Sequence, residues 1–158
     1  MDFSISFFAE KDRSDWENLI LRDSINGLFI QTRKFIDYHP VGKFKDASIC
    51  IRRGEALVGA ILAAEIIEDG LKTFFAHLGT TFGGLTVISD LLNLEDLTSL
   101  IDSVEKFLRE HGFQKIYLKL VPPIYSRDET EIIDYVLDSR NYSCHSELNY
   151  VLDLTNED

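Results

Sequence analysis

The sequence predicts one α/β domain with a mixed sheet, in which an antiparallel meander is followed by a parallel strand–helix–strand crossover. Three strand-like runs are separated by short glycine-containing turns, and such turns join only antiparallel neighbours. The third run leads into the clearest amphipathic helix of the chain and then into another strand, which implies a parallel, right-handed crossover. The 158 residues have the usual length of one domain, and we expect residues 1–158 to form a single unit.

The first elements are a strand and two helices. Apolar residues alternate with serines over residues 3–7, which is typical of a strand with one buried face. Ser14 and Glu17 have the spacing of a capping box, so they predict the start of a helix. Asn26-Gly27 would end this helix. A short second helix is expected over residues 31–38, just before a proline.

The meander is predicted over residues 47–52, 56–67 and 71–77. Its last strand runs into residues 78–87, the most irregular and glycine-dense part of the sequence. This loop therefore lies where the chain leaves the sheet.

The amphipathic helix and the crossover strand come next. Apolar residues from Leu94 to Leu108 recur every three or four positions, Asn93 can cap the start of the helix, and Gly112 can end it. The crossover strand covers residues 114–121.

The last two elements are another helix and another strand. Ser126 and Glu129 form a second capping-box pattern, which opens a helix with apolar residues between 132 and 137. Alternating apolar residues predict a final strand over residues 146–154.

The chain is acidic, with 16 Lys+Arg, 27 Asp+Glu and a formal net charge of −11. This charge repels phosphate backbones and anionic lipid surfaces, so neither general nucleic-acid binding nor attachment to an anionic membrane is expected. A basic group stands out, made of Arg33, Lys34, Lys43, Lys45, Arg52 and Arg53. Either these side chains form a solvated surface, or they attract an anionic substrate, with Arg33 as a substrate-binding residue.

Cysteine usage and hydropathy indicate a cytoplasmic location. Cys50 and Cys144 lack the paired spacing of zinc sites, so we expect two reduced thiols and no metal. The amino terminus has no basic segment of the kind that precedes a signal sequence. The longest apolar stretch, Val58 to Ala64, is too short to span a bilayer.

The predicted order of elements resembles the GNAT (GCN5-related N-acetyltransferase) fold over essentially the whole chain. Residues 26–40, 77–85 and 119–125 together resemble the amino-terminal half of Fem-like acyltransferases, a GNAT-related group associated with peptidoglycan bridges and polysaccharide synthesis. Members of that group usually carry two GNAT-like halves, and this chain has the length of one. The resemblance therefore implies a homodimer or a second GNAT-like domain as partner.

The resemblance also implies acetyl-CoA or another acyl-CoA as cofactor. In a GNAT site the pantetheine arm adds between two splayed parallel strands, and the pyrophosphate binds at the N-terminus of the next helix. The usual glycine signature for the pyrophosphate is absent here, and the helix start carries Asp90, Glu95 and Asp96. Carboxylates at a helix N-terminus repel a pyrophosphate, so we expect a degenerate donor site.

The glycine-dense loop supplies most candidate substrate-binding residues: Gly79, Thr80, Thr81, Gly83 and Gly84. In one interpretation the glycines provide positive φ angles where the sheet opens. In the other, free backbone N–H groups and threonine hydroxyls hold a carbonyl or a phosphate. Lys119, in the strand that flanks the cleft, is a further candidate.

Two residues are candidates for proton transfer. Tyr125 follows the crossover strand and could protonate a leaving thiolate, or it could be a rim residue. His77 ends the third meander strand and could accept a proton from an amine, or it could have a structural role. The first hypothesis is an N-acyltransferase that joins an activated acyl group to an amine of a small-molecule, cell-envelope or polysaccharide precursor. The second is a non-catalytic domain that binds an acceptor or a partner.

Overall fold

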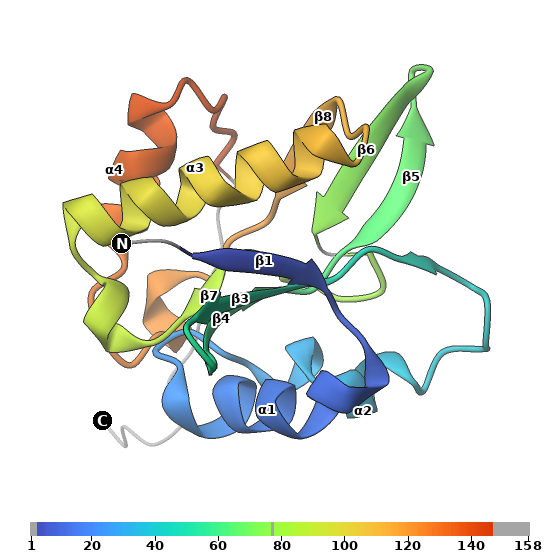
Figure 1. The fold of residues 1–158 in the computed structure, drawn as a ribbon, viewed down its shortest axis with the longest axis horizontal. Helices are drawn as coiled ribbons and strands as arrows, with labels where there is room; N and C mark the ends of the chain where they lie inside the picture. Colours follow the sequence, from blue (N-terminus) through green and yellow to red (C-terminus); the bar gives the residue numbers. More distant parts are fainter. Residues whose placement is uncertain (1–2, 77, 147–158) are drawn as a thin grey trace, which may run out of the picture.

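The computed structural model describes residues 3–76 and 78–146 (Figure 1). The strands are β1 (Ser4–Phe7), β2 (Lys45–Asp46), β3 (Ile49–Arg53), β4 (Ala56–Ile61), β5 (Ala64–Glu68), β6 (Leu71–Ala76), β7 (Thr86–Val87) and β8 (Lys115–Leu118). The α-helices are α1 (Arg13–Asn18), α2 (Arg33–Ile36), α3 (Leu94–Glu110) and α4 (Glu131–Ser139). The strands form two sheets, in the orders β1–β3–β4–β7 and β2–β5–β6–β8.

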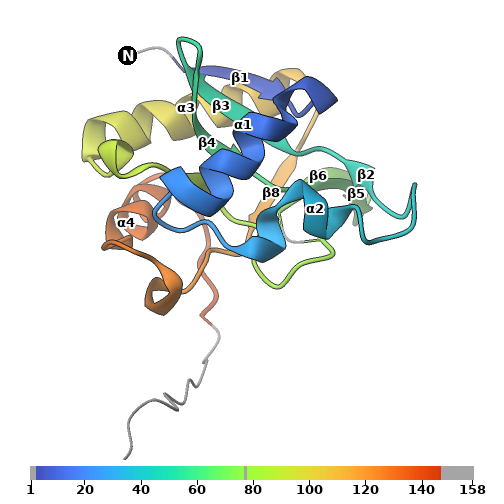
Figure 2. The same cartoon turned by 90° about the horizontal axis from the view of Figure 1, so that it is seen from below.

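The pairing confirms the mixed topology. Neighbours β3–β4 and β5–β6 are antiparallel, whereas β6 and β8 are parallel, with Thr73 opposite Lys115 and Ala76 opposite Leu118. Helix α3 connects this parallel pair, as the sequence predicted. Figures 1 and 2 show α1 and α2 on one side of the first sheet and α3 and α4 on the other. Each side has its own apolar core, and Trp16 is at the centre of the smaller one.

The prediction of one strand over residues 56–67 was wrong. The strand breaks at Leu62 and Ala63, so that β4 and β5 belong to different sheets. The side chain of Ser48 explains the break, because its hydroxyl accepts the N–H of Ala63 at 3.1 Å and donates to the carbonyl of the same residue at 3.3 Å. The Ala63 carbonyl also accepts the backbone N–H of Ala47 at 3.0 Å, so the Ser48 side chain replaces a backbone partner only for the Ala63 N–H, at the point where the two sheets meet.

The first helix begins earlier than Ser14. A 3₁₀ turn at Glu10–Asp12 precedes α1, and the carboxylate of Asp12 accepts the N–H of Ala9 at 3.0 Å. The helix then ends in a π turn at Leu19–Asp23. Asp12 is buried and paired with Arg52 at 3.0 Å. Arg52 belongs to a strand far along the sequence, so a local capping pattern does not predict this contact.

The capping box at Ser126 and Glu129 was also wrong, because α4 begins at Glu131. Arg127 holds the preceding segment away from a helical path. Its N–H donates to the carbonyl of Ile25 at 2.7 Å, and its guanidinium donates to carbonyls at the end of the first helix. These contacts delay the helix by several residues.

Helix α3 forms where the sequence predicted it. The Asn93 side chain accepts the N–H of Asp96 at 2.9 Å, and Gly112 has a φ of +79° after the last turn. The predicted face is buried except for Leu94, which is 51% exposed. Within the described ranges, none of the helices has both the length and the apolar character that crossing a bilayer requires.

Two predictions fall outside the described residues. Of the strand expected at residues 146–154, only Ser146 belongs to the described residues. His77 lies outside them. Both stay predictions.

Candidate functional site

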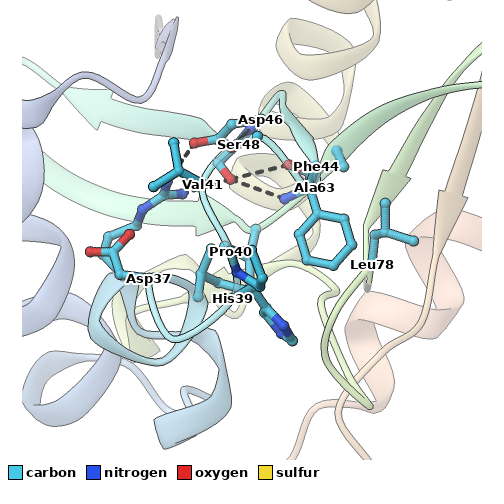
Figure 3. Close-up of a pocket in the computed structure, with 14 residues that line it drawn as sticks. Asp37, His39, Pro40, Val41, Phe44, Asp46, Ser48, Ala63 and Leu78 are labelled. Atoms are coloured by element: carbon cyan, nitrogen blue, oxygen red, sulfur yellow. Dashed lines mark hydrogen bonds and ion pairs between the residues drawn. The ribbon is translucent and has the colours of Figure 1, made fainter.

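A hollow of about 290 Å³ lies between α2, the loop of residues 37–46 and the break between β4 and β5 (Figure 3). We call it the α2 pocket. Its apolar walls come from Ile36, Pro40, Val41, Phe44, Leu62, Ala63, Ala64 and Leu78, and its polar groups come from Arg33, Asp37, His39, Asp46 and Ser48. Figure 3 shows Asp37 and Leu78 on opposite sides of the pocket. An apolar hollow with a few convergent polar groups is the usual form of a small-molecule site.

Arg33 forms the polar floor of the α2 pocket. It is 6% exposed and pairs with the carboxylate of Asp46, and it donates to the hydroxyl of Ser48 at 3.0 Å. Its guanidinium also lies 4.0 Å from the centre of the Phe8 ring. Its Nε is buried and has no hydrogen-bond partner within the described part of the chain. Arg33 is therefore mainly a structural cation that fixes Asp46.

Asp46 stays ionised in this setting. Burial acts to raise its pKa, but hydrogen bonds from Arg33 and Ser48 and the positive charge of Arg33 prevail, so the pKa of Asp46 is below its ordinary value. Asp37 is more exposed and is held by Arg13 at 2.7 Å. The α2 pocket thus presents two carboxylates, each paired with an arginine, among apolar side chains and the polar groups of Arg33, His39 and Ser48.

His39 connects the α2 pocket to the glycine loop, by which we mean residues 78–84. Its Nε2 lies 3.2 Å from the carbonyl oxygen of Gly79, and because a carbonyl can only accept, Nε2 carries the proton. The Nδ1 atom is then the acceptor for the Lys43 ammonium at 3.4 Å. Gly79 has a φ of +83°, and a Cβ there would stand 2.7 Å from the Phe44 ring. Only glycine fits this position, which favours the structural interpretation of Gly79.

The other end of the glycine loop is hydrogen-bonded to the segment that follows β8. The N–H groups of Gly83 and Gly84 both donate to the carbonyl of Lys119, at 3.2 and 3.0 Å. A Cβ on Gly84 would lie 2.8 Å from the Cα of Leu120, so the two backbones are in direct contact. These two amides are engaged within the chain rather than presented to a ligand.

The remaining predicted residues of this region lie nearby. The Thr80 hydroxyl donates to the carbonyl of Phe82 at 2.8 Å, and Thr81 is exposed. The Phe82 ring lies 6.2 Å from the ring of Tyr125, which is 45% exposed on a 3₁₀ turn after β8. The structure therefore brings the glycine loop, Lys119 and Tyr125 together. Arg33 lies in the α2 pocket, which meets the other end of the same loop at Leu78 and Gly79.

The start of α3 is occupied by its own side chains. Asn93 accepts the N–H of Asp96 and donates to the Asp96 carboxylate at 2.9 Å, and that carboxylate also binds Arg53 at 2.9 Å. The hydrogen bond from Asn93 lowers the pKa of Asp96, and Arg53 acts in the same direction against burial. Asp96 therefore stays charged, and the first turn of α3 is already complemented by a carboxylate.

A second hollow, which we call the α3–α4 hollow, lies between the starts of α3 and α4 and measures about 470 Å³. It is lined by Ser89, Leu92, Asp128, Glu129, Glu131 and Ile132. Two helix N-termini would ordinarily favour an anion at such a place. Three carboxylates line it instead, so the residues present do not fit the diphosphate of a CoA.

The basic group of the sequence is balanced by acids. Lys45 pairs with Glu65 at 2.6 Å, and Arg53 pairs with Asp96. Arg52 lies between two aspartates of the first helical segment. Together with buried Arg33, which pairs with Asp46, these contacts give four of the six residues of the group an acidic partner and favour ion pairs within the chain over attraction of an anionic substrate.

Sequence reasoning missed a buried polar network that positions β7. Asn26 donates to the carbonyl of Leu85 at 2.7 Å and accepts the N–H of Val87 at 3.1 Å, and Gln31 donates to the Thr86 hydroxyl at 2.9 Å. Polar residues embedded among apolar ones in residues 26–33 were the available signal. Throughout residues 3–76 and 78–146, no three His, Cys, Asp or Glu side chains gather in an arrangement that could hold a metal ion.

Comparison with known proteins identifies the fold. No protein-family model and no curated protein sequence matches the chain. Solved structures do match over nearly the full length. A ribosomal-protein-alanine N-acetyltransferase from Brucella melitensis biovar Abortus 2308 has a TM-score of 0.56 at 16% identity, and the match covers 98% of this chain and 100% of the other.

An aminoglycoside acetyltransferase from an uncultured soil metagenomic sample, in complex with sisomicin, has a TM-score of 0.55 at 14% identity, covering 96% and 97% of the two chains. The acetyltransferase AAC(6')-Iy, in complex with a CoA bisubstrate analog, has a TM-score of 0.57 at 11% identity, covering 97% and 99%. At these identities the likeness shows architecture rather than activity. The chain has the GNAT fold.

Proposed function

We propose that the chain is a GNAT-type N-acyltransferase domain that takes an amine acceptor in the α2 pocket. The carrying observation is the position of the two carboxylates, Asp37 and Asp46, on apolar walls beside the glycine loop. This loop leaves the carboxyl end of β6, next to the parallel strand β8, and ligands of open α/β sheets bind at such ends.

The chemistry of the α2 pocket supports an amine with an apolar body. The carboxylates of Asp37 and Asp46 would accept hydrogen bonds from an ammonium group beside those from Arg13 and Arg33, and the apolar side chains would bury the rest of the molecule. For transfer, the bound ammonium releases one proton to solvent, the neutral nitrogen attacks the acyl carbon, and the bond from carbon to the leaving sulfur or oxygen breaks. The nitrogen then loses its second proton to solvent, and Tyr125 would donate its phenolic proton to the leaving group and recover one from solvent. Transfer should therefore become faster as pH rises towards the pKa of the bound amine.

Several finer predictions stay open. The cell-envelope acceptor and the Fem-like relationship rest on the three short stretches at residues 26–40, 77–85 and 119–125. The homodimer or second GNAT-like domain rests on the same resemblance. The cytoplasmic location is supported by two free cysteines, Cys50 and Cys144.

A second function, acceptor binding without catalysis, is favoured by a separate observation. The amides of Gly83 and Gly84 are paired with Lys119, and carboxylates line the α3–α4 hollow. A domain that had lost its donor site would have these features.

The test uses tyramine as the amine and S-acetyl-N-acetylcysteamine as a short thioester donor, with N-acetyltyramine measured by mass spectrometry. We expect product above the uncatalysed background, and an approximately tenfold lower kcat/KM for Asp37→Asn because one carboxylate charge is lost. Asp15→Asn is the matched control, since Asp15 is also an exposed, ion-paired aspartate but lies outside the α2 pocket. Tyramine binding without any transfer would support the second function and contradict the first.

A further inference from the structure

The GNAT architecture places a donor site at the carboxyl ends of β6 and β8, with the starts of α3 and α4 beside it. Acyl-CoA has an amide-bearing pantetheine arm and a diphosphate. The arm needs an exposed strand edge with which its amides can pair, and the diphosphate needs helix N-termini that can bind negative charge. In this protein the strand edge is paired with the glycine loop, and the helix N-termini are surrounded by carboxylates of the chain.

The strand edge is closed by the glycine loop. Within the described residues, parallel pairing between β6 and β8 reaches Ala76 and Leu118. One residue further, the Lys119 carbonyl receives the N–H groups of Gly83 and Gly84. The contact is tight, because even one added carbon on Gly84 would meet the Leu120 backbone at 2.8 Å. An incoming arm would have to break both hydrogen bonds and move the loop.

Carboxylates near the N-termini of α3 and α4 disfavour the binding of a diphosphate there. Asn93 and Asp96 satisfy the first turn of α3, so that its dipole is already complemented. Asp128, Glu129 and Glu131 are exposed and line the α3–α4 hollow. A diphosphate brought there would face three like charges, and the repulsion is strongest at low ionic strength.

We propose that this chain excludes acyl-CoA from the donor position of its fold, through the pairing of the glycine loop with Lys119 and through the carboxylates of the α3–α4 hollow. The inference refines the proposed function, because any donor that serves the transfer then carries no diphosphate at this position. It also holds if the chain transfers nothing.

The test is calorimetric titration with acetyl-CoA. We expect no measurable binding to the wild type. The variant Asp128→Asn/Glu129→Gln/Glu131→Gln should bind measurably, with an affinity about tenfold or more above the detection limit that bounds the wild type, since the like charges are gone. Its matched control is Glu55→Gln/Asp69→Asn/Glu110→Gln, which changes the net charge equally at exposed positions elsewhere and should leave binding unmeasurable.

Gly84→Ala tests the loop. The added methyl group cannot fit against Leu120, so the loop leaves the strand edge, and binding should tighten further when this change is combined with the charge variant. Gly70→Ala is the control for a glycine replacement that strains the backbone elsewhere, because Gly70 lies in a remote turn with a φ of +79° and nothing within 4 Å of its Cβ, and it should leave acetyl-CoA binding unchanged. If Gly84→Ala does not fold, amide exchange in the wild type replaces it. The Gly83 and Gly84 amides should be protected and should stay protected when acetyl-CoA is added.

Three results would overturn the proposal: micromolar binding of acetyl-CoA to the wild type, equal affinities for the charge variant and its control, or loss of Gly84 protection on adding acetyl-CoA. Failure of the proposed function looks different. In that case tyramine and S-acetyl-N-acetylcysteamine give no product, while acetyl-CoA is still excluded from the wild type and admitted by the variants.

Discussion

The α2 pocket and the α3–α4 hollow differ in the side chains that line them. The α2 pocket leaves a hollow of about 290 Å³ with Asp37 and Asp46 at its walls. At the α3–α4 hollow, carboxylates line the space beside the helix starts, and nearby the amides of the glycine loop are paired with Lys119. One fold can thus keep the geometry for one ligand and lose it for another, so function has to be argued from each site separately.

The difference has a local cause at each place. The α2 pocket exists because Ser48 interrupts the long strand at Ala63 and Arg33 holds Asp46 at the break. The strand edge is closed because Gly84 has no side chain, which lets the backbone of Gly83 and Gly84 approach closely enough to bond to the Lys119 carbonyl. Changes at these positions should therefore affect one place without the other.

The largest effect is expected from Asp46→Ala. Removal of the carboxylate leaves the buried Arg33 guanidinium without its ionic partner. We expect a loss of about 2–3 kcal/mol in the free energy of unfolding, somewhat below the cost for a fully buried pair because the Asp46 side chain is 43% exposed. Urea denaturation measures this loss. Asp37→Ala, at an exposed carboxylate of the same pocket, should cost less than about 1 kcal/mol, and equal losses for the two variants would contradict the role given to Arg33.

Gly79→Ala comes next. It places a side chain at a φ of +83° and 2.7 Å from the Phe44 ring, so both backbone strain and a clash oppose it. We expect a loss of about 2 kcal/mol. Gly42→Ala has nearly the same φ, +78°, with open space around the Cβ, and should cost only about 1 kcal/mol. Equal losses in unfolding free energy for the Gly42 and Gly79 variants would show that the contact with Phe44 does not contribute to the cost of Gly79→Ala.

A smaller effect is expected from His39→Phe. The ring can still pack against Phe44, but the hydrogen bond to the Gly79 carbonyl is lost, at a cost of about 1 kcal/mol. Amide exchange of residues 78–84 should become faster. His111→Phe is the matched control, because His111 bonds within its own helix, and it should leave exchange in the glycine loop unchanged.

The smallest effect is a dependence on pH. The pKa of Asp46 is lowered in the folded protein, so its ionised form stabilises the fold fully above about pH 4, the usual range of an unfolded aspartate. This contribution is lost as the pH falls through the lower pKa of the folded state. The difference in unfolding free energy between the wild type and Asp46→Asn should therefore shrink below about pH 4. If this difference in unfolding free energy grew as the pH fell, the pKa of Asp46 would be raised in the folded protein rather than lowered.

The sequence sufficed for the parts of the fold that depend on local periodicity. The buried face of α3, its cap at Asn93 and its end at Gly112 follow from spacing alone, and they imply the parallel crossover that β6 and β8 form. The break at Ala63 did not follow, because its cause is the side chain of Ser48 on another strand.

The caps at Ser14 and Ser126 failed for a related reason. Asp12 and Arg127 make contacts with distant segments, and these contacts override the local pattern. Long-range hydrogen bonds thus decide where these two helices begin.

The site was predicted in part. Composition pointed to the glycine loop and to carboxylates at the start of α3, and the structure places Tyr125 beside the loop. The α2 pocket was missed, because its residues become neighbours only when Asp37 and Asp46 fold against residues 62–64 and Leu78. No spacing in the sequence carries that information.

The most direct test is a titration of the uniformly ¹⁵N-labelled wild type, followed by its amide resonances, with tyramine and separately with acetyl-CoA. We expect tyramine to shift the amide resonances of His39, Asp46 and Leu78, and acetyl-CoA to leave those of Ser89 and Lys119 unchanged. Acetyl-CoA shifts at Ser89 and Lys119, with no response of the α2 pocket to tyramine, would contradict both expectations.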